Sequence, residues 1–161
     1  TLWSQQDIES IIKINEIVKK DQKKLILFDH SVCSKPLLSY GFNRLDYFVY
    51  INERLPDKRE LNELEKQLFN DFDVRTCYYQ IVNQFNDQIY KIASENNIDL
   101  VTMKDIYCDV GEKSCPLLTQ EGFKIYFDYG HVTRKGAEFF SKRLEKNNQF
   151  LNYLNYQSNV D

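Results

Sequence analysis

The sequence contains no apolar run that approaches the roughly 20 residues of a membrane-spanning helix. It also lacks a surplus of positive charge, because 21 Lys and Arg stand against 24 Asp and Glu and leave a net charge of -3. Nucleic acids and anionic membranes are bound by clustered Lys and Arg, so neither is expected as a partner. The 161 residues suffice for one domain with its own hydrophobic core.

Histidine is scarce as well, and the two that are present, His30 and His131, lie far apart in the sequence. No Cys-x-x-Cys pair accompanies them, so a zinc site is not expected, and we predict no metal and no cofactor. His30 directly follows Asp29 near the end of a predicted strand, where adjacent side chains point to opposite faces and cannot support each other. We therefore interpret His30 as a structural histidine.

The four cysteines fall into two groups. Cys108 and Cys115 bracket the polar segment Asp-Val-Gly-Glu-Lys-Ser, and a glycine-containing loop of this length can close so that the two sulfurs meet. We predict a disulfide between them, which indicates a location outside the cytoplasm. Cys33 and Cys77 can pair only if the fold brings them together, and two buried free thiols are the open alternative.

Apolar periodicity divides the chain into helices and short strands. A helix is predicted from Ser4 to about Lys20, with Ser4 and Asp7 as a capping box. Continuous apolar runs predict strands at 24–28 and 98–102, each buried on both faces of a parallel sheet. Further helices are predicted over 57–69, over 78–96 and from Thr133 to about Leu144, whereas 45–55 is ambiguous between helix and strand.

Helices that alternate with buried strands in this order favour an α/β fold, a layered parallel sheet with helices on both faces. In such folds the chemistry lies at the carboxyl ends of the strands. The loop after Phe28 and the segment around Asp128 and His131 lie at such ends. The helix that follows this segment is predicted to turn four residues inward, namely Ala137, Phe139, Phe140 and Leu144.

Asp128 and His131 flank a Tyr-Gly turn, and the glycine can take a positive φ that aims both side chains at a common point. An aspartate bonded to one imidazole nitrogen selects the tautomer and stabilises the imidazolium that forms when the other nitrogen takes a proton. Such a pair activates a hydroxyl nucleophile. From the spacing alone, the open alternative is that His131 is a surface or capping histidine just before a helix and that Asp128 ends a strand.

The run Asp128-Tyr-Gly-His131-Val-Thr-Arg-Lys-Gly136-Ala137 resembles the last conserved block of SGNH-type esterases and acyltransferases, an Asp-x-x-His before a Gly-Ala helix start. From Leu2 to about Leu144, the order of elements and the cysteine-bracketed loop resemble the SGNH domains fused behind membrane-bound acyltransferases. The resemblance implies an SGNH/flavodoxin-like fold whose N-terminal part is missing. It implies a partial SGNH-like domain over 1–147 and a C-terminal tail over 148–161.

By this resemblance His131 is the general base and Asp128 its orienting partner. Such family members transfer acyl groups, usually acetyl, to cell-surface polysaccharide or lipopolysaccharide sugars. The resemblance thus implies an acyl donor delivered by a membrane acyltransferase domain, a saccharide acceptor, and an extracytoplasmic (periplasmic or cell-surface) location with a membrane tether. A catalytically inactive SGNH-like module that binds carbohydrate or scaffolds a partner is an alternative, as is an SGNH esterase.

The family's nucleophilic serine, in a Gly-Asp-Ser block, has no counterpart in this sequence. We expect the serine and the oxyanion-hole donors to lie upstream of Thr1, so that the 161 residues alone are inert. Gly41-Phe-Asn43 has the Gly-x-Asn spelling of the oxyanion block but comes one helix and one strand too late, so we interpret it as a loop turn that touches substrate. Trp3 lies where that block belongs and is a candidate for the acyl pocket, with core packing as its alternative.

Overall fold

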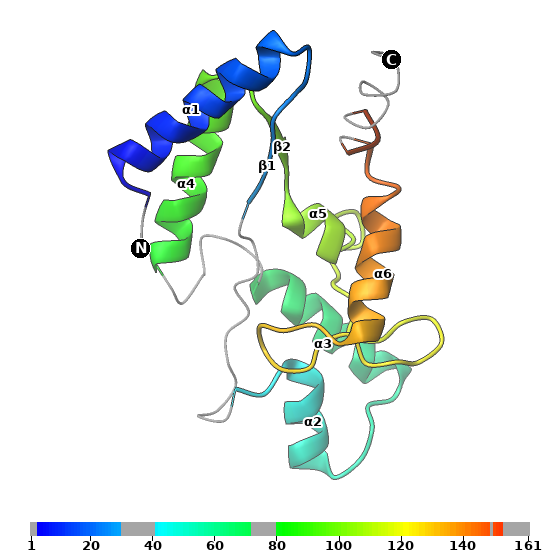
Figure 1. Cartoon of the computed structure of the whole chain (residues 1–161). Helices are drawn as coiled ribbons and strands as arrows, with labels where there is room; N and C mark the ends of the chain where they lie inside the picture. Colours follow the sequence, from blue (N-terminus) through cyan, green and yellow to red (C-terminus); the bar gives the residue numbers. More distant parts are fainter. Residues whose placement is uncertain (1–2, 30–40, 72–79, 149, 153–161) are drawn as a thin grey trace.

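The computed structural model describes residues 3–29, 41–71, 80–148 and 150–152. In chain order the elements are α1 (Gln5–Lys20), β1 (Ile26–Phe28), α2 (Arg44–Asn52), α3 (Lys58–Asp71), α4 (Gln80–Glu95), β2 (Asp99–Val101), α5 (Met103–Tyr107) and α6 (Arg134–Leu144). Figure 1 shows α1 and α4 on one side of the strands and α6 on the other. None of the helices in this described part combines the length and apolar character that a bilayer crossing demands.

The sheet confirms the α/β prediction, with β1 and β2 paired in parallel within the described ranges. Leu27 lies opposite Leu100 in the register, and both pack into a cluster formed with α1 and α4. Val101 is fully buried in a second core cluster, which also contains Leu117 and Phe140. The expectation of burial on both faces is wrong for Phe28, which is 39% exposed, because only the ring of Phe150 packs against it at 6.5 Å among the described aromatic residues.

Helix α1 begins as the sequence predicts. The Ser4 side chain accepts a hydrogen bond from the Asp7 N–H, and the Asp7 carboxylate accepts one from the Ser4 N–H, which completes the capping box. The apolar face of the helix packs on α4 through Ile8 and Ile11. At the far end, the Asn15 side chain donates to the Asn96 carbonyl at 3.1 Å. The two helices therefore form one layer over the sheet.

The ambiguous segment 45–55 is largely helical. Helix α2 is capped by Asn43, whose side-chain oxygen accepts the Asp46 N–H at 2.9 Å. Helix α3 starts after Asp57, whose carboxylate accepts the Glu60 N–H at 2.8 Å, as its position predicts. These two helices lie at the lower end of the molecule in Figure 1, beyond the carboxyl ends of the strands.

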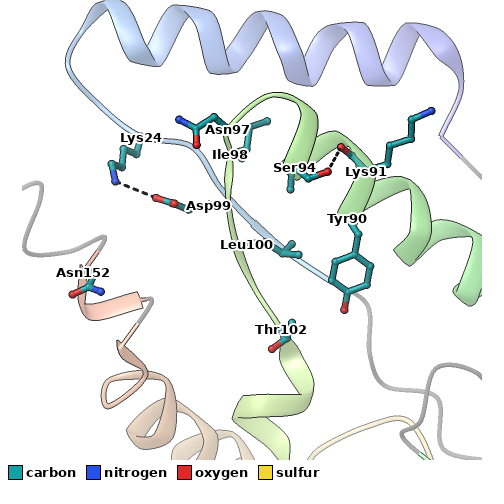
Figure 2. Close-up of a pocket in the computed structure, with 11 residues that line it drawn as sticks. Lys24, Tyr90, Lys91, Ser94, Asn97, Ile98, Asp99, Leu100, Thr102 and Asn152 are labelled. Carbon is teal, nitrogen blue, oxygen red and sulfur yellow. Dashed lines mark hydrogen bonds and ion pairs between the residues drawn. The ribbon is translucent and has the colours of Figure 1, made fainter.

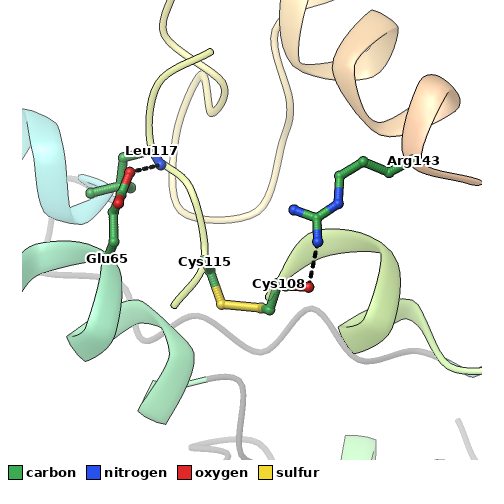
Figure 3. The surroundings of a disulfide bond; sticks show 5 residues. All are labelled: Glu65, Cys108, Cys115, Leu117 and Arg143. Atoms are coloured by element: carbon green, nitrogen blue, oxygen red, sulfur yellow. Dashed lines mark hydrogen bonds between the residues drawn. A yellow bond between two sulfur atoms is a disulfide. The ribbon is translucent and has the colours of Figure 1, made fainter. Parts of the chain in front are cut away.

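The predicted disulfide between Cys108 and Cys115 is present, and both residues are buried in the core. Figure 3 shows the segment between α5 and Leu117 tied to two helices. The Glu65 backbone carbonyl of α3 accepts the Cys115 N–H at 3.1 Å, and its side chain accepts the Leu117 N–H at 3.0 Å. On the other side, Arg143 of α6 donates to the Cys108 carbonyl at 2.5 Å. The possible pairing of Cys33 with Cys77 lies outside the described residues.

Helix α6 confirms the predicted start at Thr133, but one of its predicted core residues is wrong. Phe140 is buried, and Phe139 and Leu144 pack against the same core cluster. Ala137 is exposed instead, because the close approach of the helix to the 124–126 segment is made by its neighbour Gly136, which is buried. The inward face of the helix therefore starts one residue earlier than predicted.

Candidate active site

The segment that carries Asp128 and His131 is a small closed loop over 126–132. A bridge between Tyr126 and Val132 holds its ends together. Within it the Phe127 N–H donates to the His131 carbonyl at 2.8 Å, and the Asp128 carboxylate accepts the Gly130 N–H at 2.8 Å. Gly130 is not among the glycines with positive φ, so the expected left-handed turn is wrong. The Asp128 carboxylate shapes this turn instead, by accepting the backbone donors that follow it.

The two side chains form the pair that a catalytic dyad requires. His131 Nδ1 lies 2.8 Å from Asp128 Oδ2 and 3.0 Å from Oδ1. Because a carboxylate only accepts hydrogen bonds, this contact places the ring proton on Nδ1 and leaves Nε2 as the nitrogen that can take a proton. The His131 side chain is 79% exposed and that of Asp128 30% exposed, so solvent or a reactant reaches the ring directly.

The surroundings of Asp128 keep it ionised. Partial burial raises the pKa of the carboxyl, but hydrogen bonds from the Gly130 N–H, the His131 side chain and the His131 N–H outweigh it, so that the pKa lies below its ordinary value. The Asp128 carboxylate is therefore charged over the whole neutral range. A charged carboxylate at Nδ1 is the condition for stabilising an imidazolium.

Contacts from the start of α6 hold the loop in place. Thr133 caps the helix by accepting the Gly136 N–H at 3.0 Å, while its hydroxyl donates to the Lys124 carbonyl at 2.6 Å. Its N–H donates to the Ile125 carbonyl at 2.8 Å. Gly136 allows this approach, since a Cβ there would lie 2.2 Å from the Ile125 oxygen. The loop is thus anchored to a helix two residues after His131.

A second anchor comes from the start of α2. The Asn43 side-chain N–H groups donate to the Tyr126 carbonyl at 3.2 Å and to Asp46 Oδ2 at 2.8 Å. Asp46 in turn pairs with Lys124 Nζ at 2.6 Å. Lys124 Nζ also donates to the Phe127 carbonyl at 3.1 Å, so the ion pair extends to the closed loop itself.

Of the three residues predicted to contact substrate, Gly41 and Asn43 lie beside the dyad loop and Trp3 does not. The Gly41 carbonyl accepts the Tyr129 N–H at 3.2 Å. Asn43 is only 7% exposed, and its amide is engaged by Asp46 and Tyr126, which gives it a structural role as a cap. Trp3 packs edge-on against Phe85, with ring centroids 5.0 Å apart, in the cluster on the α1 and α4 side of the sheet. The core-packing alternative for Trp3 is the one that the structure supports.

An open hollow on the described part of the chain lies away from the dyad, since neither Asp128 nor His131 lines it. It has a volume of about 990 Å³ and lies along β2 and α4, from Lys24 and Asp99 to Thr102 (Figure 2). Next to the dyad, a closed cavity of only about 10 Å³ is lined in part by Asn43, Tyr126 and Asp128. A water molecule barely fits there, so this cavity is too small for an acyl group.

Sequence reasoning missed the residues that support the dyad. Lys124, Asp46 and Tyr129 contact the loop or its anchors but carry no local pattern that marks them. The Asn43-x-x-Asp46 spacing is the one signal that could have been found, because it is a helix-capping pattern. His30 lies outside the described residues. Within those ranges no three His, Cys, Asp or Glu side chains gather as metal ligands would.

Comparison with known proteins adds one finding to this geometry. A family model described as "SGNH domain (fused to AT3 domains)" matches residues 42–146, about two-thirds of the chain. The matched segment contains the α2 anchor, the disulfide, the Asp128–His131 loop and the start of α6. No curated protein and no solved structure matches the sequence. The chain belongs to the family of SGNH domains that are fused to AT3 domains, and is an acyltransferase-associated SGNH module.

Proposed function

We propose that this domain supplies the general base of an O-acyltransferase that transfers an acyl group, usually acetyl, to a cell-surface polysaccharide or lipopolysaccharide sugar. The observation that carries the proposal is the contact of both Asp128 oxygens with His131 Nδ1, at 2.8 and 3.0 Å, which leaves Nε2 as the base. Membership of a family fused to AT3 domains supports acyl transfer as the chemistry.

In the proposed reaction, His131 Nε2 takes the proton of a serine hydroxyl supplied from outside these 161 residues. The serine oxygen bonds to the acyl carbon, the bond from the acyl carbon to the donor breaks, and Nε2–H returns the proton to the departing donor group. A sugar hydroxyl then gives its proton to Nε2 and attacks the acyl-enzyme. The serine oxygen leaves and regains the proton, which restores the starting state.

Two features bear on the partners and location that we propose. His131 is largely exposed, so water reaches Nε2 as readily as a sugar hydroxyl does. Transfer rather than hydrolysis therefore requires that the acceptor or another part of the protein covers Nε2. We propose that the membrane acyltransferase domain delivers the acyl donor at this open edge. The Cys108–Cys115 disulfide favours an extracytoplasmic location, because such bonds are rare in the reducing cytoplasm.

A fluorophosphonate probe tests the proposal without knowledge of the acceptor, because it labels only an activated serine. The probe is applied to the protein that carries this domain together with its serine. His131→Ala should abolish labelling, and Asp128→Asn should lower its rate by about 10⁴-fold, because the amide imposes the wrong tautomer. Arg134→Ala is the matched control, since this 93% exposed side chain pairs with Glu138 and lies outside the dyad.

The outcomes separate the alternatives. Labelling that persists in His131→Ala would rule out His131 as the base. A wild-type protein that resists the probe but binds glycan equally well with or without Asp128 and His131 would identify an inactive binding module. A protein that reacts with the probe and that, unlabelled and supplied with an acetyl ester as donor, releases free acetate at the same rate with and without saccharide would be identified as an esterase.

A further inference from the structure

Gly41 occupies a position beside the dyad loop that favours glycine, both by its backbone conformation and by the space around it. Its φ is +69°, in the left-handed region that other residues rarely adopt. A Cβ at this position would lie 3.1 Å from Tyr129 Cδ1 and 3.2 Å from Cε1, which is tighter than an ordinary contact. Because Gly41 lacks a Cβ, the Tyr129 ring can lie close to the Gly41 backbone.

Tyr129 lies at the middle of the loop, between the anchors at its two ends. The Tyr126–Val132 bridge closes the ends of the loop, and Asn43 holds the Tyr126 carbonyl. Between them, the Tyr129 N–H donates to the Gly41 carbonyl at 3.2 Å, and two carbons of its ring lie next to the position that a Gly41 Cβ would take. Tyr129 directly follows Asp128 in the chain, so whatever fixes its backbone also fixes the direction of the Asp128 carboxylate.

We propose that Gly41 is a positioning residue of the catalytic pair, acting through Tyr129 to hold Asp128 against His131 Nδ1. This inference rests on the proposed function of the pair. It adds a defined structural role to the substrate contact that the sequence predicts for Gly41. The consequence is chemical, because a carboxylate that turns away from Nδ1 no longer selects the tautomer in which Nε2 accepts a proton.

The test is the tautomer of His131, measured by ¹⁵N NMR of the imidazole nitrogens in this chain. The spectrum is simple because the sequence contains two histidines, and His30→Gln assigns them. The spectra are recorded over a series of rising pH values, and the tautomer is read once the imidazole shifts no longer change with pH. Wild-type His131 should show the Nδ1–H tautomer, and Gly41→Ala should lower the Nδ1–H population at least twofold.

Gly122→Ala is the matched control for backbone strain. Gly122 also has a positive φ, +83°, but a Cβ added to it would find no atom within 4 Å. Its substitution should therefore cost similar strain and leave the His131 tautomer unchanged. An equal loss in Gly41→Ala and Gly122→Ala would overturn the inference, because it would indicate a general loss of structure.

A second pair of variants keeps the test valid if Gly41→Ala does not fold. Tyr129→Phe retains the ring carbons that lie over Gly41 and should keep the Nδ1–H tautomer, whereas Tyr129→Ala should lose it. A wild-type His131 without the Nδ1–H preference would refute the proposed function itself. A preference that is lost in Asp128→Asn but retained in both Gly41→Ala and Tyr129→Ala would refute only the role of Gly41.

Discussion

Replacing Gly136 with alanine should destabilise the chain, although a glycine-to-alanine change in a helix usually stabilises a protein. Helix propensity alone favours alanine by about 1 kcal/mol. A Cβ on Gly136, however, would lie 2.2 Å from the Ile125 oxygen and 3.0 Å from its carbonyl carbon. Non-bonded heavy atoms are in contact at about 3.5 Å, so the start of α6 must move away by roughly 1 Å.

That movement breaks the contacts by which Thr133 holds the dyad loop. Its N–H lies 2.8 Å from the Ile125 oxygen and its hydroxyl 2.6 Å from the Lys124 oxygen, and both distances would exceed hydrogen-bond range. Each bond contributes about 1 kcal/mol, and overpacking adds a cost of about 1–3 kcal/mol. After the gain in propensity is subtracted, Gly136→Ala should destabilise the chain by about 2–4 kcal/mol.

Thermal and urea unfolding followed by circular dichroism measure this effect. For a chain of this size the loss corresponds to a fall in Tm of roughly 4–16 °C. Gly111→Ala is the control, because the nearest atom to its added Cβ, Asp109 Oδ1, lies at an ordinary 3.4 Å, and its stability should stay within about 0.5 kcal/mol of the wild type. A Gly136→Ala variant as stable as the wild type, or more stable, would refute the reasoning.

Two further predictions concern the core beneath the loop. Replacing both Cys108 and Cys115 with alanine should lower the free energy of unfolding by about 2–3 kcal/mol, because the bond closes a short loop in the unfolded chain; an unchanged urea midpoint would contradict this. Burial raises the pKa of the Glu65 carboxyl, although the Leu117 N–H donates a hydrogen bond to it. Because the pKa is higher in the folded state than the value near 4.3 in the unfolded state, the protonated carboxyl stabilises the fold below about pH 4.3. This stabilisation is lost as the pH rises. Glu65→Gln keeps the acceptor without the charge, so it should be more stable than the wild type at pH 7 but not at pH 3.5; a Tm difference independent of pH would refute this.

The local features of the fold were predictable because their signals lie within a few residues of each other. Ser4 and Asp7 are three residues apart and form the predicted capping box. Thr133 likewise caps the helix that its position predicts, through the N–H of Gly136. The contact between Asp128 and His131 also spans three residues, so the sequence could place the pair even though their catalytic roles stay a prediction.

The support for the dyad was not predictable, because it depends on contacts between distant segments. Asn43 and Tyr126 are separated by 83 positions, and Lys124 and Asp46 by 78, so no periodicity links them. The error at Gly130 has a different, local cause, because the Asp128 carboxylate accepts the N–H of the residue two positions later and shapes the turn without a positive φ. The Gly-x-Asn spelling is the only local signal at Gly41, and its contact with Tyr129 appears only when the two segments are folded together.

The most direct test of the central claim is the rate of acyl transfer to saccharide by the full protein with and without the His131 imidazole. If His131 is the general base, His131→Ala should lower kcat by at least about 10²–10⁴-fold, and Arg134→Ala should match the wild type. A His131→Ala enzyme that transfers acyl groups at the wild-type rate would contradict the assignment of the Asp128–His131 pair as the catalytic base.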